Sequence, residues 1–215
     1  VSSYAKAAIQ NEIEGLTRYP DGNGFILKQA LSHRLGVSEQ MITLGNGSND
    51  VLDLITRAYA GPGSEVIYSQ YAFAVYALAT QSVGATAVVT PALDWGHDLE
   101  AMAAAITEAT SIIFIANPNN PTGTWVRGEA LERFLKAVPA TTLVVLDEAY
   151  VEYVDDPAYP NGLGLLDQFS NLVVTRTFSK AYGLAALRLG YAVSHPDVAD
   201  LMNRIRQPFN VNSMA

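Results

Sequence analysis

The stretch SIIFIANPNNPTG, residues 111–123, joins an almost unbroken apolar run to a stiff polar loop. Its first seven residues are mostly apolar at consecutive positions, whereas a half-exposed strand would alternate apolar with polar side chains. This pattern predicts a strand in a sheet that helices cover on both faces. Pro118 and Pro121 then fix φ and restrict the residues before them. Such a rigid loop could present amides to an oxygen of a planar ligand, although a plain turn would have the same features.

Similar apolar runs, rich in Val and Ile, alternate along the chain with segments that suit helices. Strands are expected at 41–45, 65–69, 86–90, 111–117, 142–147, 171–177 and 189–194. Helices are expected at 25–35, 49–60, 72–82, 98–108, 127–137 and 196–206. This alternation predicts a three-layer α/β/α domain around a mostly parallel sheet of about seven strands.

Composition limits the class of protein. The chain has 215 residues, of which 49% are hydrophobic and 16% charged, so one large domain with a sizeable core is expected. Thirteen basic against 21 acidic side chains give a net charge of -8, with no basic cluster, and we therefore expect no nucleic-acid partner. Without cysteine and with three scattered histidines, no disulfide and no metal site are expected. A reducing, cytoplasmic setting suits this composition.

One uncharged stretch, residues 66–93, is long enough to span a bilayer. However, it contains Gln70, Gly84 and Pro91, and its pattern changes partway from helical to strand-like. We therefore expect buried elements of a globular domain here and no membrane partner.

Ligands of open α/β sheets bind where the carboxyl ends of strands lead into helices. Four segments stand at such places, namely GNGSND (45–50), NPNNPTG (117–123), DEAY (147–150) and TFSK (177–180). In the first, two glycines permit tight turns, and Ser48 or Asn49 can cap the next helix and aim free N–H groups at an anion. Asp50 replaces the third glycine of a dinucleotide fingerprint, which weakens a nucleotide-binding alternative. An ordinary capped turn is the other alternative.

The third and fourth segments carry opposite charges. Asp147 ends a strand so apolar that its carboxylate should be buried, where it needs a cation or hydrogen-bond donors. A salt bridge to arginine, or capping of the next helix, would also explain it. Lys180 lies among small and apolar residues, where desolvation would favour its neutral, nucleophilic amine, although a solvated surface lysine is the alternative. The hydroxyls of Thr177 and Ser179, with the Arg188 guanidinium, suit a phosphate.

Together the four segments offer an amine, a carboxylate, amide and phenol donors, and an anion site. Pyridoxal 5′-phosphate requires this set of groups, because it has an aldehyde, a pyridine nitrogen, a phenolic oxygen and a phosphate. We therefore expect pyridoxal 5′-phosphate as the cofactor.

NPNNPTG, DEAY and SKAYGLAALRLGY, in this order and spacing, resemble the class I/II aminotransferases of the fold-type I pyridoxal-phosphate enzymes. Within that family the sequence is similar to the histidinol-phosphate aminotransferase branch, through TRYPDGNG (17–24), LGNGSNDVLDLI (44–55) and RTFSKAYGLAALRLGY (176–191). The resemblance implies amino transfer between histidinol phosphate and 2-oxoglutarate in histidine biosynthesis. Two alternatives remain. One is another aminotransferase, for aromatic or other amino acids, or a phosphoamino-acid decarboxylase of the same fold. The other is a catalytically incomplete, cofactor-binding fragment.

The resemblance also implies a role for each matching residue. Lys180 would hold the cofactor covalently and then move a proton between the substrate α-carbon and the cofactor C4′, while Asp147 would keep the pyridine nitrogen protonated. Tyr150, the third catalytic residue, and Asn120 would hydrogen-bond the phenolic oxygen. Phe73 would stack on the ring, without the hydroxyl of the tyrosine that many relatives have there. The residues around the phosphate would be Ser48, Asn49, Thr177, Ser179 and Arg188.

The resemblance extends to the assembly. Tyr19 would reach across a dimer interface to the neighbouring subunit's site, which implies a homodimer. We expect residues 1–24 to form an N-terminal segment with the dimer contact and residues 25–215 to form the cofactor-binding large domain. The family's C-terminal small domain, which carries the arginine for the substrate α-carboxylate, is not represented in this sequence.

Overall fold

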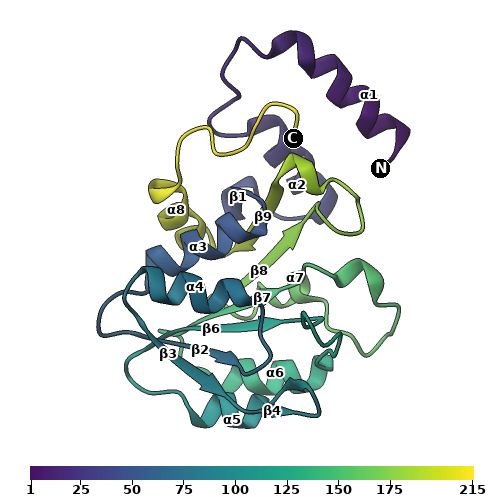
Figure 1. Cartoon of the computed structure of the whole chain (residues 1–215). Helices are drawn as coiled ribbons and strands as arrows, with labels where there is room; N and C mark the ends of the chain where they lie inside the picture. The colour runs from purple at the N-terminus through teal and green to yellow at the C-terminus, as the bar shows by residue number, and fades with distance from the viewer.

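A seven-stranded sheet forms the centre of the computed structural model, which describes all residues 1–215 (Figure 1). The strand order is β1-β9-β8-β7-β6-β2-β3. These strands are β1 (Ile42–Asn46), β2 (Glu65–Ser69), β3 (Thr86–Thr90), β6 (Thr110–Ala116), β7 (Leu143–Asp147), β8 (Leu172–Thr177) and β9 (Leu189–Ser194). Only β9 runs against the others, because it pairs antiparallel with both β8 and β1. The prediction of a mostly parallel sheet of about seven strands is confirmed.

Helices cover both faces of this sheet, as the three-layer prediction requires. The α-helices are α1 (Ser3–Glu12), α2 (Phe25–Leu35), α3 (Ser48–Tyr59), α4 (Ala74–Ser82), α5 (Leu99–Ala104), α6 (Gly128–Ala137), α7 (Gly162–Leu165) and α8 (Pro196–Ile205). Buried side chains of α3, α4 and α8 share one hydrophobic cluster with the sheet, and those of α2, α5, α6 and α7 share another. No helix is long and apolar enough to cross a membrane.

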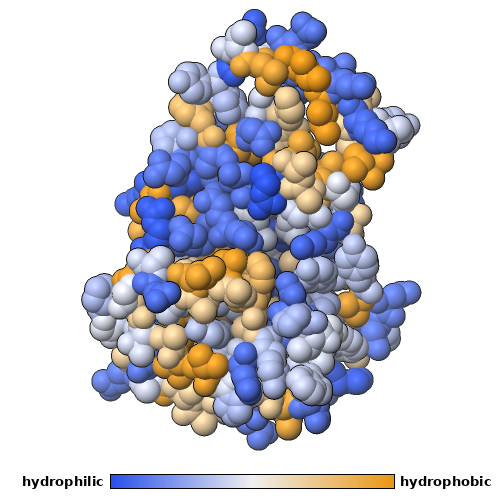
Figure 2. Space-filling view, viewed as in Figure 1, coloured by the Kyte–Doolittle hydropathy of each residue, from blue (hydrophilic) through white to orange (hydrophobic).

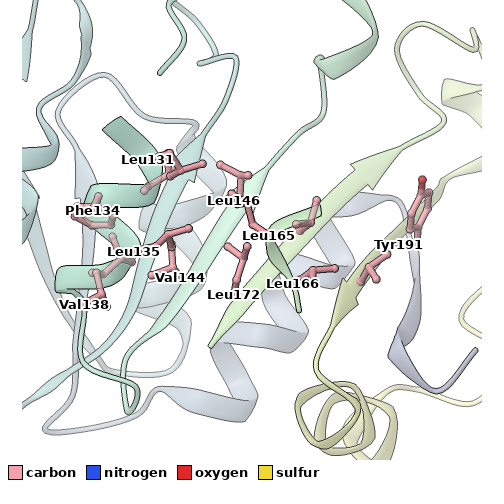
Figure 3. Close-up of a cluster of buried hydrophobic side chains, with 14 of the residues drawn as sticks. Leu131, Phe134, Leu135, Val138, Val144, Leu146, Leu165, Leu166, Leu172 and Tyr191 are labelled. Atoms are coloured by element: carbon pink, nitrogen blue, oxygen red, sulfur yellow. The ribbon is translucent and has the colours of Figure 1, made fainter. Parts of the chain in front are cut away.

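The central strand β6 shows why its apolar residues are consecutive. Ile112 and Phe114 belong to the cluster under α3 and α4, whereas Ile113 and Ile115 belong to the cluster on the other face. All four side chains are fully buried, because successive residues of a strand point to opposite faces. Figure 3 shows the second cluster, where leucines and Phe134 of α6 face the strands.

The sheet edge departs from the sequence prediction. The strand β3, which was expected to be buried, has only β2 as a neighbour, so Thr86, Ala87 and Val89 are exposed. The segment after it forms a small hairpin of β4 (Ala92–Leu93) and β5 (Gly96–His97) that the sequence pattern does not predict.

Three helices also differ from expectation, and one of them is the short helix α7, which was not predicted. Helix α5 ends at Ala104, earlier than expected, because the Thr107 hydroxyl accepts a hydrogen bond from the Ala109 amide (3.1 Å) and donates one to the Glu65 carboxylate (2.6 Å). Such local side-chain bonds offer the backbone an alternative to the helix. Helix α1 was not predicted, has no buried residue and lies apart from the sheet at the top of Figure 1.

Candidate active site

The four predicted loops converge on one cavity of about 190 Å³ at the carboxyl ends of the central strands. Ten of the eleven residues that the sequence analysis singled out line it, and they come from five separate parts of the chain. They are Ser48, Asn49, Phe73, Asn120, Asp147, Tyr150, Thr177, Ser179, Lys180 and Arg188. The remaining wall is formed by Ala116, Pro118 and Ala149. The structure therefore brings an amine, a carboxylate and hydroxyl, amide and guanidinium donors to one place.

The carboxylate of Asp147 lies at the end of β7 and is 5% exposed. Each of its oxygens accepts a hydrogen bond from a buried hydroxyl, Oδ2 from Tyr76 at 2.9 Å and Oδ1 from Thr175 at 3.0 Å. Burial raises the pKa of Asp147, and these two hydrogen bonds and the charge of Lys180 only partly oppose the rise. The alternative of a salt bridge from Asp147 to arginine is wrong, since no guanidinium is among its partners, which are two hydroxyls and the Ala149 amide.

The arginine pairs instead with the next residue. Arg176 donates through Nε (2.9 Å) and Nη2 (2.7 Å) to Oε2 of Glu148, whose side chain is fully buried. The Gly162 amide donates to the other oxygen of Glu148 at 3.2 Å. Because neighbouring residues of an extended chain point to opposite faces, Asp147 and Glu148 meet different partners. Burial raises the pKa of Glu148, and the Arg176 charge opposes the rise.

Lys180 lies three residues beyond the end of β8, on the rim of the cavity. Its side chain is exposed, so the predicted desolvation of this amine is wrong for the structure described here. The loop leaves the sheet before it reaches Lys180, and apolar neighbours in sequence do not enclose the amine in space. The Lys180 Nζ atom lies 5.2 Å from the centroid of the Tyr150 ring, within the range of a cation–π contact.

The first turn of α3 forms one wall of the cavity. Gly47 occupies the N-cap position with φ of 83°, and no side chain caps the helix. Ser48 and Asn49 were predicted as possible caps, but they are instead the first two helical residues. The first N–H groups of a helix have no partner within it, so this end of α3 suits an anion. The Asp50 carboxylate turns away to accept from the Asn46 amide at 2.8 Å.

Two glycines allow the arginine and the helix terminus to come together. A Cβ at Gly47 would collide with the Arg188 guanidinium, and a Cβ at Gly190 would collide with the Ser48 amide. Arg188 has a left-handed backbone, with φ of 53°, and its Nη1 donates to the Ser179 hydroxyl at 3.3 Å. The Thr177 hydroxyl accepts from the Ser179 amide at 3.1 Å. Hydroxyls, a guanidinium and a helix terminus therefore surround one side of the cavity.

The opposite side carries an aromatic ring and an amide. Phe73 precedes α4, and its half-buried ring meets the Tyr76 ring edge-on at 5.9 Å. Asn120 lies in the loop at 117–123, which Asn117 stabilises by accepting a hydrogen bond from the Val126 amide at 2.7 Å. Asn119 extends this support through its side-chain amide, which donates to the Tyr71 carbonyl at 2.8 Å.

Tyr19 is the one predicted residue that does not line the cavity. It is 83% exposed, and its ring packs on Phe209 at 4.9 Å in a separate groove between the first helices and the end of the chain. Its predicted role concerns a neighbouring subunit and stays a prediction.

Sequence reasoning missed the residues behind the cavity. Tyr76 follows Phe73 by three residues, so one helical turn places its ring directly behind Phe73. Thr175 pairs with Asp147 in the register of β7 and β8, which is a signal that strand alignment alone could have supplied. No sequence signal assigned Arg176 to Glu148.

Known proteins resemble this chain in sequence and in fold. A family model described as aminotransferase class I and II matches residues 1–215. The chain is 60% identical over 214 residues to histidinol-phosphate aminotransferase 2 of Pseudomonas fluorescens, covering 100% of this chain and 58% of that protein. It is 60% identical over 211 residues to histidinol-phosphate aminotransferase 1 of Cupriavidus pinatubonensis, covering 98% and 56%.

Among solved structures, histidinol-phosphate aminotransferase from Sinorhizobium meliloti in complex with pyridoxal-5′-phosphate matches with a TM-score of 0.94 and 35% identity, over 99% of this chain and 58% of that one. L-threonine-O-3-phosphate decarboxylase from Porphyromonas gingivalis shares the fold, with a TM-score of 0.86 and 24% identity, over 99% and 65%. The chain thus spans about 58% of the length of the first curated relatives that it matches.

Proposed function

The chain belongs to the class I and II aminotransferases, and we propose that its protein exchanges an amino group between histidinol phosphate and 2-oxoglutarate. The products are imidazole-acetol phosphate and glutamate, and pyridoxal 5′-phosphate is the proposed cofactor. The observation that carries the proposal is that Lys180, Asp147 and an anion site around Arg188 line one cavity. A cytoplasmic location in histidine biosynthesis completes the proposal, and the cysteine-free composition suits a reducing compartment.

The donor set around the cavity fits this cofactor. The Asp147 carboxylate is buried with hydroxyl and backbone amide donors but no cation among its hydrogen-bond partners. Burial raises its pKa, so a protonated pyridine nitrogen would supply the cation that it lacks. The hydroxyl and guanidinium donors near α3 match a phosphate. The amine of Lys180 is free of any carboxylate salt bridge and can react with an aldehyde.

Pyridoxal phosphate, when bound, supplies an aldehyde carbon and a ring that withdraws electrons from the substrate α-carbon. Lys180 would hold it covalently and, once released, would carry the proton to and from the substrate α-carbon. Asp147 would keep the ring nitrogen protonated. Asn120 and Tyr150 would donate hydrogen bonds to the phenolic oxygen, and Phe73 would pack on the ring face.

The phosphate needs more than the helix terminus. A helix terminus contributes about 0.3–1 kcal/mol to a nearby anion, whereas micromolar affinity requires about 8 kcal/mol. Direct hydrogen bonds must therefore supply most of the non-covalent affinity. We assign them to Ser48, Asn49, Thr177, Ser179 and Arg188, which share the cavity wall.

The substrate assignment rests on the names of the most similar relatives and on TRYPDGNG at 17–24. The protein loaded with pyridoxal phosphate is expected to form glutamate from histidinol phosphate and 2-oxoglutarate, and neither substrate alone should suffice. Glutamate is measured by a coupled dehydrogenase assay, with Lys180→Ala as the background. Release of carbon dioxide from a phosphoamino acid without a keto acid would instead indicate a decarboxylase, whose fold this chain shares. No turnover with either substrate would favour the cofactor-binding fragment.

We further propose that the protein is a homodimer whose contact includes residues 1–24. Apolar side chains are exposed at this end of the molecule, where Figure 2 shows hydrophobic surface near α1. They include Tyr4, Ile13, Leu16, Tyr19, Phe25 and Ile26. Exposed apolar patches of this kind mark interaction surfaces.

Sedimentation equilibrium is expected to give twice the chain mass for the parent protein. Leu16→Asp together with Ile26→Asp should shift the protein to the monomer, because both side chains are more than half exposed at 57% and 80% and would bury a charge in the contact. Leu201→Asp, at 37% exposure on α8, is the control for a surface charge elsewhere. A monomeric parent would refute the homodimer.

A further inference from the structure

Tyr76 lies directly behind the candidate site and does not line its cavity. It is fully buried in the first turn of α4, and its hydroxyl donates to Oδ2 of Asp147 at 2.9 Å. Its ring stacks on Phe114, with parallel planes and centroids 4.5 Å apart. The edge of the same ring meets Phe73 at 5.9 Å and 90°. One side chain thus touches both the carboxylate and the aromatic ring of the site.

The contacts of Tyr76 leave its hydroxyl little freedom. Stacking on Phe114 in β6 fixes the plane of the ring, and helix α4 fixes its base. Burial and the nearby Asp147 charge raise the pKa of Tyr76 well above its ordinary value. The phenol therefore stays neutral and keeps its proton for Asp147.

Thr175 completes the support from the neighbouring strand. It is fully buried, and its hydroxyl donates to Oδ1 of Asp147 at 3.0 Å. The two hydroxyls come from different elements and hold different oxygens, so rotation of the carboxylate would break at least one bond. A buried acceptor that loses its donor is costly, which favours this single orientation.

We propose that Tyr76 and Thr175 are positioning residues that hold the Asp147 carboxylate toward the cofactor ring nitrogen, and that Tyr76 also supports the stacking ring of Phe73. This inference rests on the proposed cofactor. Neither residue touches the cavity, so each acts through Asp147 or Phe73.

Removing the Tyr76 hydroxyl is expected to weaken cofactor binding and turnover together. Tyr76→Phe keeps the ring and its stacking but leaves Asp147 with one donor fewer, so its charged form is less favoured. The free energy of a hydrogen bond to a charged group predicts that its loss raises the pyridoxal phosphate dissociation constant roughly tenfold or more. The kcat should fall with it, whereas the KM for histidinol phosphate should change little, since Tyr76 does not line the cavity.

Tyr68→Phe is the matched control. Tyr68 is 8% exposed in the same hydrophobic cluster, its ring lies 6.5 Å from that of Tyr76, and it makes no hydrogen bond to Asp147. The dissociation constant and kcat should stay at the parental values. Thr175→Val should reproduce the loss, whereas Thr175→Ser should keep the parental values, because only Ser keeps a hydroxyl. If Tyr76→Phe fails to fold, the comparison of Thr175→Val with Thr175→Ser still tests the positioning role.

A second measurement needs no cofactor. The carboxyl ¹³C signal of Asp147 in the cofactor-free protein should titrate at higher pH in Tyr76→Phe and in Thr175→Val than in the parent, and unchanged in Tyr68→Phe. Equal titration in all variants would refute the positioning role, even if the parent binds the cofactor and turns over. Failure of the parent to bind pyridoxal phosphate would instead refute the proposed function.

Discussion

Lys180→Ala is expected to abolish covalent attachment of pyridoxal phosphate and to reduce transamination to background. Lys180 is the only lysine that lines the cavity, so no second amine can replace it. The fold should survive, because this exposed side chain contributes no core packing. Its contact with the Tyr150 ring predicts a loss of at most about 1 kcal/mol in the free energy of unfolding.

The covalent link is measured by borohydride reduction and intact mass, which adds the cofactor to the parent chain only. Lys136→Ala is the matched control, since this lysine is exposed on α6 and pairs weakly with Glu132 at 3.9 Å. It should retain both label and activity. Label that persists at full yield in Lys180→Ala would show that another residue carries the cofactor.

Asp147→Asn is expected to lower kcat by at least about a hundredfold, the scale seen when one preorganised electrostatic group is removed. Asn keeps the size of the side chain and can still bond to the Tyr76 and Thr175 hydroxyls, so the cavity keeps its shape. The variant lacks only the negative charge that would retain a proton on the ring nitrogen. Single-turnover kinetics with histidinol phosphate separates this loss from any change in binding, and a parental rate would remove Asp147 from the mechanism.

Asp147→Asn lowers kcat, but it is not expected to lower the stability of the cofactor-free protein. The folded pKa of Asp147 lies above its unfolded value, so ionising this carboxyl costs more in the folded chain. Its destabilising contribution is absent below the unfolded pKa, grows as the pH rises toward the folded pKa and is constant above it. Cofactor-free Asp147→Asn should therefore be at least as stable as the parent at neutral pH. Urea denaturation should show this advantage disappearing in acid, and a variant less stable than the parent at neutral pH would contradict it.

Much of the fold follows from local pattern. Strand β6 is apolar on consecutive residues because both of its faces are covered, and this pattern locates all seven sheet strands within one residue of their ends, although edge strand β3 is largely exposed. The rule that ligands bind at carboxyl strand ends then brings four loops to one place, and the cavity lies there. These signals depend only on neighbours in sequence.

What could not be predicted depends on contacts between distant residues. Lys180 has apolar neighbours in sequence, yet the loop exposes it. Arg176 pairs with Glu148 and not with Asp147. The two carboxylates lie on opposite sides of the chain, and this side decides the partner of each. No sequence neighbour of Tyr76 indicates that its hydroxyl forms a hydrogen bond with Asp147, which is 71 positions away. Helix α1 buries nothing, so no apolar stripe marks it.

The reversed direction of β9 has a consequence for the order in which the site assembles during folding. Strands β8 and β9 are antiparallel and are joined by residues 178–188, whereas the parallel neighbours β7 and β8 are joined by the longer crossover at 148–171. Lys180 and Arg188 both lie on the shorter connection and can come together through contacts of low sequence separation. Asp147 must wait for the slower parallel pairing of β7 with its neighbours. The Lys180 amine and the Arg188 guanidinium should thus come together early, whereas Asp147 and the start of α3 at Ser48 and Asn49, which depend on pairings distant in sequence, should join them late.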